Sequence, residues 1–118
     1  MFNLEKLEVW QKAIDFADLV YVNTREFPAE ERFGLTNQMR RAAVSISSNI
    51  AESFSRSFRT DFARSIEIAT GSVFEVVSQF FVGRCQGFLN KSRFDALYRA
   101  AEEQSKMLSG LRKSLGVK

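Results

Sequence analysis

The clearest pattern of apolar positions lies in the third quarter of the chain, between residues 60 and 86. Six apolar residues alternate spacings of four and three without a break: Phe62, Ile66, Ala69, Val73, Val76 and Phe80. This alternation is typical of a helix with a heptad seam. The pattern predicts a helix over 60–86 that ends before Gly87, with Phe88 and Leu89 folding back onto its end.

Three other segments each carry a single apolar stripe at helical spacing and predict helices over 8–25, 35–54 and 91–115. Their stripes, in chain order, are Val9, Ala13, Phe16 and Val20; Leu35, Met39, Ala42, Ile46 and Ile50; and Phe94, Leu97, Ala101, Gln104, Leu108, Leu111 and Leu115. Four helices with short connections predict an all-α chain, an antiparallel up-down four-helix bundle that forms one domain over residues 1–118.

The connections carry their own signals. Phe27-Pro28 ends the first predicted helix, because proline pushes the preceding residue out of the helical region. Residues 28–31 resemble a single helical turn, and Gly34 breaks it. Ser57 or Thr60 is expected to cap the third helix, and Asn90 the fourth.

A second apolar stripe runs along one flank of the third predicted helix, formed by Phe74, Val77 and Phe81. A helix with two apolar faces needs two neighbours, or one neighbour and another subunit. Two stripes on one helix exceed what a lone bundle usually buries, and the twelve phenylalanines fit either an aromatic-rich core or spare rings at an interface. We therefore expect this flank to be a homo-oligomer interface.

Composition agrees with long helices, since the chain has one proline and six glycines. The lone Cys85 forms no internal disulfide, which suits a reducing compartment. No signal peptide and no run of about 18 apolar residues is evident, so we expect a cytoplasmic protein without a membrane partner.

The absence of histidine limits the chemistry. Ser-His-Asp and Cys-His mechanisms are excluded, and the Glu-x-x-His motif of di-iron bundles does not occur. Glu67 and Glu75 could share one face of the third predicted helix but form no metal-binding motif. Asp15 and Asp18, one turn apart, are expected on a solvent-exposed face of the first. We predict no enzyme activity, no catalytic residue, no metal site and no cofactor.

Five arginines form the candidate nucleic-acid site: Arg40, Arg41, Arg56, Arg59 and Arg64. The last three are expected to gather at one end of the bundle. A guanidinium presents a planar fork that suits phosphate oxygens, and each neutralised phosphate releases counterions. The net charge of +3 permits such a partner without requiring one.

Two interpretations of these arginines stay open. In the first, they bind RNA or DNA phosphates and Phe58 stacks on an unpaired base. In the second, they pair with nearby carboxylates while Phe58 packs on the bundle end. The carboxylates in reach are Glu30, Glu31, Glu52 and Asp61, and Glu52 precedes Arg56 by one helical turn.

A polar stripe formed by Ser45, Asn49 and Glu52 lies along one side of the second predicted helix. A partly buried asparagine at a helix seam often fixes register or oligomer state. We favour that structural role over a ligand site.

Several short blocks of the sequence carry a family resemblance. They are Val9-Trp10-Gln11-Lys12-Ala13, Phe27-Pro28, Glu31, Gly34-Leu35, Gln38, Arg41-Ala42-Ala43-Val44-Ser45-Ile46, Ser48-Asn49-Ile50-Ala51-Glu52, Arg56, Phe62, Ile68-Ala69, Gly71-Ser72, Glu75, Met107-Leu108 and Gly110-Leu111. With them, the chain resembles the four-helix-bundle family encoded by intervening sequences within bacterial 23S ribosomal RNA genes. It is also similar to the accessory protein of diversity-generating retroelements.

This resemblance implies a homo-oligomer, a ring of five bundles, with RNA or DNA and a reverse transcriptase as partners. A protein-interaction scaffold without a nucleic-acid role is the alternative. Two positions depart from the usual family pattern, with Ser47 in place of proline and Ser53 in place of glycine. We expect a straighter second helix that continues beyond Glu52.

Overall fold

Four long helices make up the computed structural model, which describes residues 1–117. They are α1 (Glu8–Thr24), α2 (Leu35–Ser53), α3 (Arg59–Cys85) and α4 (Lys91–Ser114), with short 3-10 turns η1 (Asn3–Lys6) and η2 (Ala29–Glu31) before α1 and α2. Residues 1–117 contain no strand. The all-α class and the four helices are confirmed, and every helix end lies within one residue of its predicted position.

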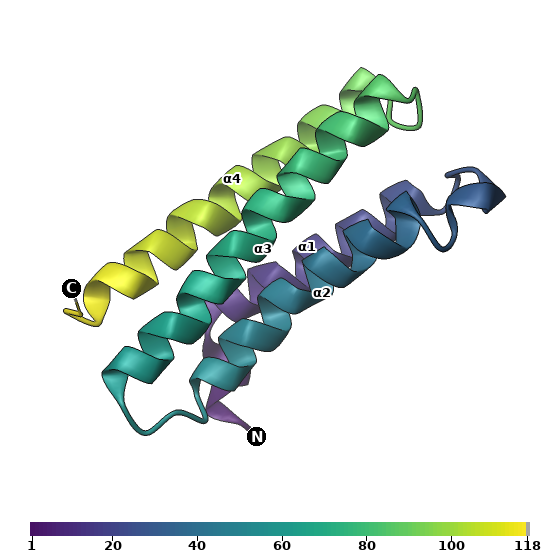
Figure 1. The fold of residues 1–118 in the computed structure, drawn as a ribbon. Helices are drawn as coiled ribbons and strands as arrows, with labels where there is room; N and C mark the ends of the chain where they lie inside the picture. The colour runs from purple at the N-terminus through teal and green to yellow at the C-terminus, as the bar shows by residue number, and fades with distance from the viewer. Residues whose placement is uncertain (118) are drawn as a thin grey trace.

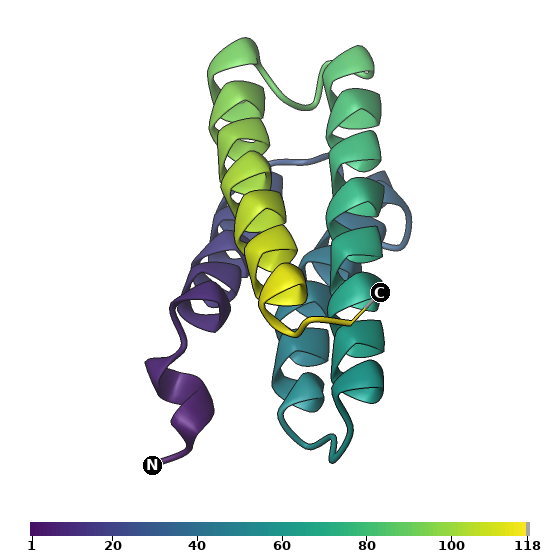
Figure 2. The same ribbon diagram turned by 90° about the vertical axis from the view of Figure 1, so that its left-hand side faces the viewer.

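The helices lie side by side in a bundle 43 Å long and 26 by 21 Å across (Figure 1). Helix α1 packs against α2 and α4, and α3 packs against the same two helices. The α1–α2 and α3–α4 connections lie at one end, and the α2–α3 connection lies at the other (Figures 1 and 2). Each end of the bundle therefore has its own connections and its own polar residues.

The predicted stripes form the core. Residues fully shielded from solvent come from all four helices, among them Val20, Ile46, Val76, Phe80 and Leu97. Burying one such side chain stabilises the fold by about 1.5–3 kcal/mol relative to leaving it exposed. Gln104, the polar member of the α4 stripe, is also buried, and its Nε2 donates to the Val9 carbonyl of α1 at 3.2 Å. This bond satisfies its amide nitrogen.

Helix α3 is long and apolar enough to cross a membrane by length and composition alone. Its seam residues Ile66, Ala69, Val73, Val76 and Phe80 are buried inside the bundle, however. A core helix of a soluble protein passes the same test. Burial of the seam favours that interpretation.

The α3–α4 connection ends α3 as predicted. Gly87 adopts a φ of 78°, and the amides of Phe88 and Leu89 donate to the Gly83 carbonyl at 2.9 and 3.2 Å. Leu89 is fully buried, and a Cβ built on Gly83 would lie 3.2 Å from its Cδ1. The small size of Gly83 thus makes room for Leu89.

The predicted caps have different outcomes. Asn90 caps α4 as predicted, since its Oδ1 accepts a hydrogen bond from the Arg93 amide at 2.8 Å. The prediction for α3 is wrong, because Phe58 occupies the cap position and no side chain bonds to the helix start. The first turn of α3 thus lacks the side-chain capping hydrogen bond that α4 has.

Candidate nucleic-acid interface

The five predicted arginines fall into two groups. Arg40 and Arg41 lie in the first half of α2, whereas Arg56, Arg59 and Arg64 lie around the α2–α3 connection. Arg41 and the end of α2 at Ser53 are about 18 Å apart at 1.5 Å per helical residue. The two groups therefore lie on separate parts of the surface.

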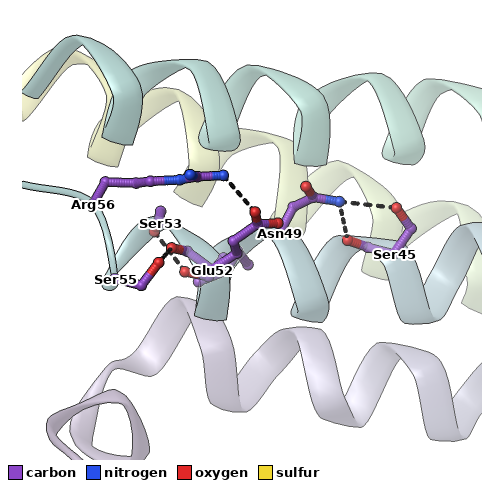
Figure 3. A network of polar contacts seen from close by, with 7 residues as sticks. Ser45, Asn49, Glu52, Ser53, Ser55 and Arg56 are labelled. Carbon is purple, nitrogen blue, oxygen red and sulfur yellow. Dashed lines mark hydrogen bonds and ion pairs between the residues drawn. The ribbon is translucent and has the colours of Figure 1, made fainter. Parts of the chain in front are cut away.

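At the α2–α3 connection, Arg56 folds back along α2 and pairs with Glu52, as Figure 3 shows. For this residue the ion-pair interpretation is confirmed. Arg59 and Arg64 are exposed, and no carboxylate of residues 1–117 lies within 4.0 Å of either guanidinium. Phe58 is 69% exposed, so it does not pack on the bundle end.

The polar stripe of α2 is internally bonded (Figure 3). Asn49 Nδ2 donates to the carbonyl and the hydroxyl of Ser45, at 2.8 and 3.0 Å. Ser72 Oγ of α3 donates to the same Ser45 hydroxyl at 3.0 Å. The stripe thus links α2 to α3 through Ser45, which supports the structural role that we favour. Glu52 does not bond to Ser45 or Asn49 and pairs with Arg56.

At the other end of the bundle, α1 holds Arg40 in place. Its Nε donates to Thr24 Oγ1 at 3.0 Å, and its guanidinium carbon lies 4.6 Å from the centre of the Tyr21 ring. The Thr24 hydroxyl in turn donates to the Val20 carbonyl at 2.8 Å. A guanidinium over an aromatic face is favourable, so this charge is positioned by contacts that leave it unneutralised.

A surface groove of about 570 Å³ opens beside Arg40, between α2, the turn before it and the end of α1. Its lining residues include three arginines and no carboxylate: Tyr21, Arg32, Phe33, Thr36, Asn37, Arg40, Arg41, Val44, Ser45 and Ser48. Arg32 and Phe33 were not singled out from the sequence. The available signal was an arginine next to an aromatic residue directly before a helix, which is weak without the fold.

Arg41 also lines a second, smaller hollow of about 330 Å³ between α2 and α3. There Glu75 of α3 supplies a carboxylate, so this hollow has mixed charge. The groove beside Phe33 is therefore the more positive of the two surfaces that Arg41 borders.

The predicted oligomer surface lies on α3 and α4. Phe74 and Phe81 are 67% and 51% exposed, whereas Val77 is partly buried against the core. Phe81 contacts Phe94 edge-on, with ring centres 5.0 Å apart. Tyr98 joins Phe74 and Val77 around a largely apolar hollow of about 230 Å³. Phe74 and Phe81, with Phe94 and Tyr98, thus form an apolar surface that extends from α3 onto α4.

Within residues 1–117, no three His, Cys, Asp or Glu side chains lie close enough to hold a metal ion. Cys85 is exposed and unpaired at the end of α3. A hydrogen bond from Lys91 lowers the pKa of the Asp95 carboxyl on α4, far along the chain from the arginine groups. The arginines and the aromatic surface therefore remain the features with an evident binding chemistry.

Comparison with known proteins gives the chain its family. A family model for the 23S rRNA-intervening sequence protein matches residues 5–110. The chain belongs to this family. No curated protein matches the chain.

A solved structure is similar to this family member throughout. It is the 1.70 Å crystal structure of a protein with unknown function from the S23 ribosomal protein family from Bacteroides thetaiotaomicron VPI-5482. The TM-score is 0.80, at 21% sequence identity, over 89% of this chain and 98% of that chain. At this identity the likeness establishes the fold alone.

Ser47 and Ser53 are accommodated inside α2. Ser47 Oγ donates to the Val44 carbonyl at 2.9 Å, and Ser53 Oγ donates to the Ile50 carbonyl, one turn back. Helix α2 reaches Ser53 and Phe54 follows it as the C-cap, so the expected continuation beyond Glu52 amounts to one residue.

Proposed function

We propose that this 23S rRNA-intervening sequence protein is a non-enzymatic, homo-oligomeric protein of the cytoplasm that binds RNA or DNA. The observation that carries the proposal is that four arginines lack an acidic partner. Arg40, Arg41, Arg59 and Arg64 have no carboxylate within 4.0 Å among residues 1–117. Arg56 contributes less, because Glu52 already pairs with it.

Phosphate contact is the chemistry that these arginines support. A guanidinium that has no acidic partner gains a charge-assisted bond when it meets a phosphate, and counterions leave the nucleic acid at the same time. Among residues 1–117 no set of side chains is arranged to read base edges in a duplex groove, so we propose binding with little sequence preference.

The assembly we propose is an antiparallel up-down bundle repeated as a homopentameric ring, as the resemblance to the retroelement accessory protein implies. The exposed rings of Phe74 and Phe81 support an interface on α3 and α4. A pentamer carries five times the +3 net charge of the chain. Several arginine groups on one particle then act together, which strengthens binding without new contacts.

Such a particle suits an accessory role. We propose that it holds the RNA transcribed from ribosomal RNA intervening sequences, or the nucleic acid handled by a retroelement reverse transcriptase. The shared chemistry in both cases is a negatively charged, partly single-stranded polymer.

The direct test is a salt titration of the purified protein with structured RNA, single-stranded DNA and duplex DNA. We expect affinity to fall steeply as salt rises, because phosphate contacts release counterions. The variant Arg41→Glu/Arg59→Glu/Arg64→Glu should bind at least tenfold more weakly to all three. No binding, or an affinity that does not change with salt concentration, would contradict the proposal.

The alternative function is a protein-interaction scaffold that has no nucleic-acid role. The exposed aromatic surface around Phe74 and Phe81 favours it, because exposed apolar patches often mark protein contacts. Light scattering separates the two uses of this surface. A mass near five times the 13.5 kDa chain would indicate that the side chains of Phe74 and Phe81 form the interface between copies. A folded protein that ignores RNA and DNA but binds a protein partner supports the scaffold.

A further inference from the structure

We propose that the groove beside Phe33 binds one unpaired nucleotide of a single-stranded nucleic acid. Its base stacks on Phe33, and its flanking phosphates contact Arg32 and Arg41. This inference rests on the proposed function and makes it specific, since it names one site, one class of ligand and two residues that the sequence did not single out.

The size and floor of the groove fit this ligand. Its volume of about 570 Å³ lies within the range of small-molecule sites in proteins. Beyond Arg41, the α2 side of the groove is made by Val44, Ser45 and Ser48, which are small. Small side chains let a planar base approach the helix closely.

The charges on the groove are free to meet phosphate. Arg32 and Arg41 have no ion-pair partner among residues 1–117. Glu31 is adjacent to Arg32, but its Oε1 accepts a hydrogen bond from the Leu35 amide at 3.1 Å. That carboxylate is held at the start of α2, and it forms no ion pair with Arg32 within 4.0 Å.

The aromatic element of the site is exposed. Phe33 is 87% accessible to solvent, and no other ring of residues 1–117 stacks against it. A phenylalanine ring in water gains stability when it covers an apolar face, and every base offers one. Tyr21 and Arg40 also line the groove, as a stacked pair with the guanidinium carbon 4.6 Å from the ring centre.

Polar groups at the groove add hydrogen-bonding capacity. Thr36 is 7% exposed, and its hydroxyl has no hydrogen-bond partner among the described residues. Buried hydroxyls are normally hydrogen-bonded, so this one leaves an unused donor and acceptor next to the groove. Asn37, one residue on, is exposed at the same wall and offers both a donor and an acceptor.

The site selects unpaired over paired bases. In a duplex the bases stack on one another and their faces are covered, so Phe33 has nothing to contact. Beyond Arg41, the neighbouring hollow contains Glu75, which repels a further phosphate. The groove therefore takes one nucleotide with its flanking phosphates and does not continue along the backbone.

The test measures the affinity of a labelled ten-residue oligouridine, the matching oligothymidine and a short duplex for five proteins. These are the wild type, Phe33→Ala, Arg32→Ala/Arg41→Ala, and two controls from the opposite end of the bundle, Phe58→Ala and Arg59→Ala/Arg64→Ala. Each control copies the chemistry of a groove variant, since Phe58 is an exposed phenylalanine beside an arginine.

We expect Phe33→Ala to bind both single strands about tenfold more weakly, in line with the loss of one stacked base, and to leave duplex binding within twofold. Arg32→Ala/Arg41→Ala should make the negative slope of log affinity against log salt less steep by about 1.4 on single strands. Phe58→Ala should keep wild-type affinity, and Arg59→Ala/Arg64→Ala should weaken single strands and duplex by equal factors.

Other outcomes overturn the inference in distinguishable ways. If Phe58→Ala loses as much single-strand affinity as Phe33→Ala, or if the groove variants behave as the wild type, the groove is not the site and the proposed function still stands. If the wild type binds none of the three probes at low salt, the proposed function fails and the groove fails with it. Equal affinity for RNA and DNA agrees with stacking, whereas a requirement for the 2′-hydroxyl contradicts it.

Discussion

The two ends of the bundle carry the same local chemistry in different settings. Arg32-Phe33 precedes α2 at one end, and Phe58-Arg59 begins α3 at the other. Both phenylalanines are exposed. Around Phe33 a groove gathers two further arginines and no carboxylate. Around Phe58, the nearby Arg56 is already paired with Glu52. An aromatic residue beside an arginine therefore becomes a candidate site only where the fold adds charge and shape to it.

The ends also differ in how firmly they are packed. At the groove end, Phe27 and Phe88 join the α1–α2 connection to the α3–α4 connection, with ring centres 5.4 Å apart, and Leu89 is fully buried beneath them. At the opposite end, every residue from 54 to 61 is exposed. A rigid end positions a binding site better than an open one, because less freedom is lost when the ligand binds.

The largest expected effect tests this packing. Phe27→Ala should lower the free energy of unfolding by about 3 kcal/mol, because it removes a buried ring and leaves a cavity. Phe58→Ala, at the open end, should change it by less than about 0.5 kcal/mol. Chemical denaturation of both variants measures the difference. Equal effects would show that the two ends are packed alike.

The next effect concerns the close approach at the groove end. Gly83→Ala should destabilise the fold by about 1–2 kcal/mol, because its Cβ would lie 3.2 Å from Leu89 and the core must shift. Gly71→Ala is the matched control on the same helix, where a Cβ meets nothing within 4 Å. It should raise stability by up to about 1 kcal/mol through helix propensity. A stabilised Gly83→Ala would contradict the packing described for Leu89.

The helix caps differ between the ends in the same way. Asn90→Ala should cost about 1 kcal/mol, since Asn90 satisfies the Arg93 amide at the start of α4. Ser57→Ala should be neutral within about 0.5 kcal/mol, because no side chain caps α3. Thermal unfolding of the two variants checks this pair. A cost at Ser57 equal to that at Asn90 would restore the cap that the sequence suggested.

The smallest effect tests the paired arginine. Glu52→Gln frees Arg56, so nucleic-acid affinity should rise by about twofold at low salt. Stability should change by less than about 0.5 kcal/mol, because an exposed ion pair contributes little. The measurement is the salt titration used for the wild type. Weaker binding in this variant would mean that Glu52 supports the interface and does not neutralise it.

The helices and the core were predictable because they depend on spacing alone. The α3 seam from Ile66 to Phe80 is buried as predicted, and so is Gln104 among the leucines of α4. The ion pair of Arg56 with Glu52 was also in reach, since the two residues lie one helical turn apart. Local periodicity carries this information before any tertiary structure forms.

The groove was not predictable in the same way. Arg32 and Phe33 belong to a connection, and Tyr21 belongs to another helix, so only the packing of α1 against α2 brings them together. The stack of Arg40 on Tyr21 joins residues 19 positions apart in the sequence. The cap of α3 failed for a different, local reason, because Phe58 and not Ser57 or Thr60 occupies the cap position.

Photochemical crosslinking tests the central claim most directly. A single-stranded RNA that carries 4-thiouridine is irradiated with the wild-type protein, and the crosslinked tryptic peptide is identified by mass spectrometry. We expect the label on the peptide of residues 33–40, which begins with Phe33 and ends with Arg40. Crosslinks confined to the peptide that contains Phe58, with none on residues 33–40, would contradict the account.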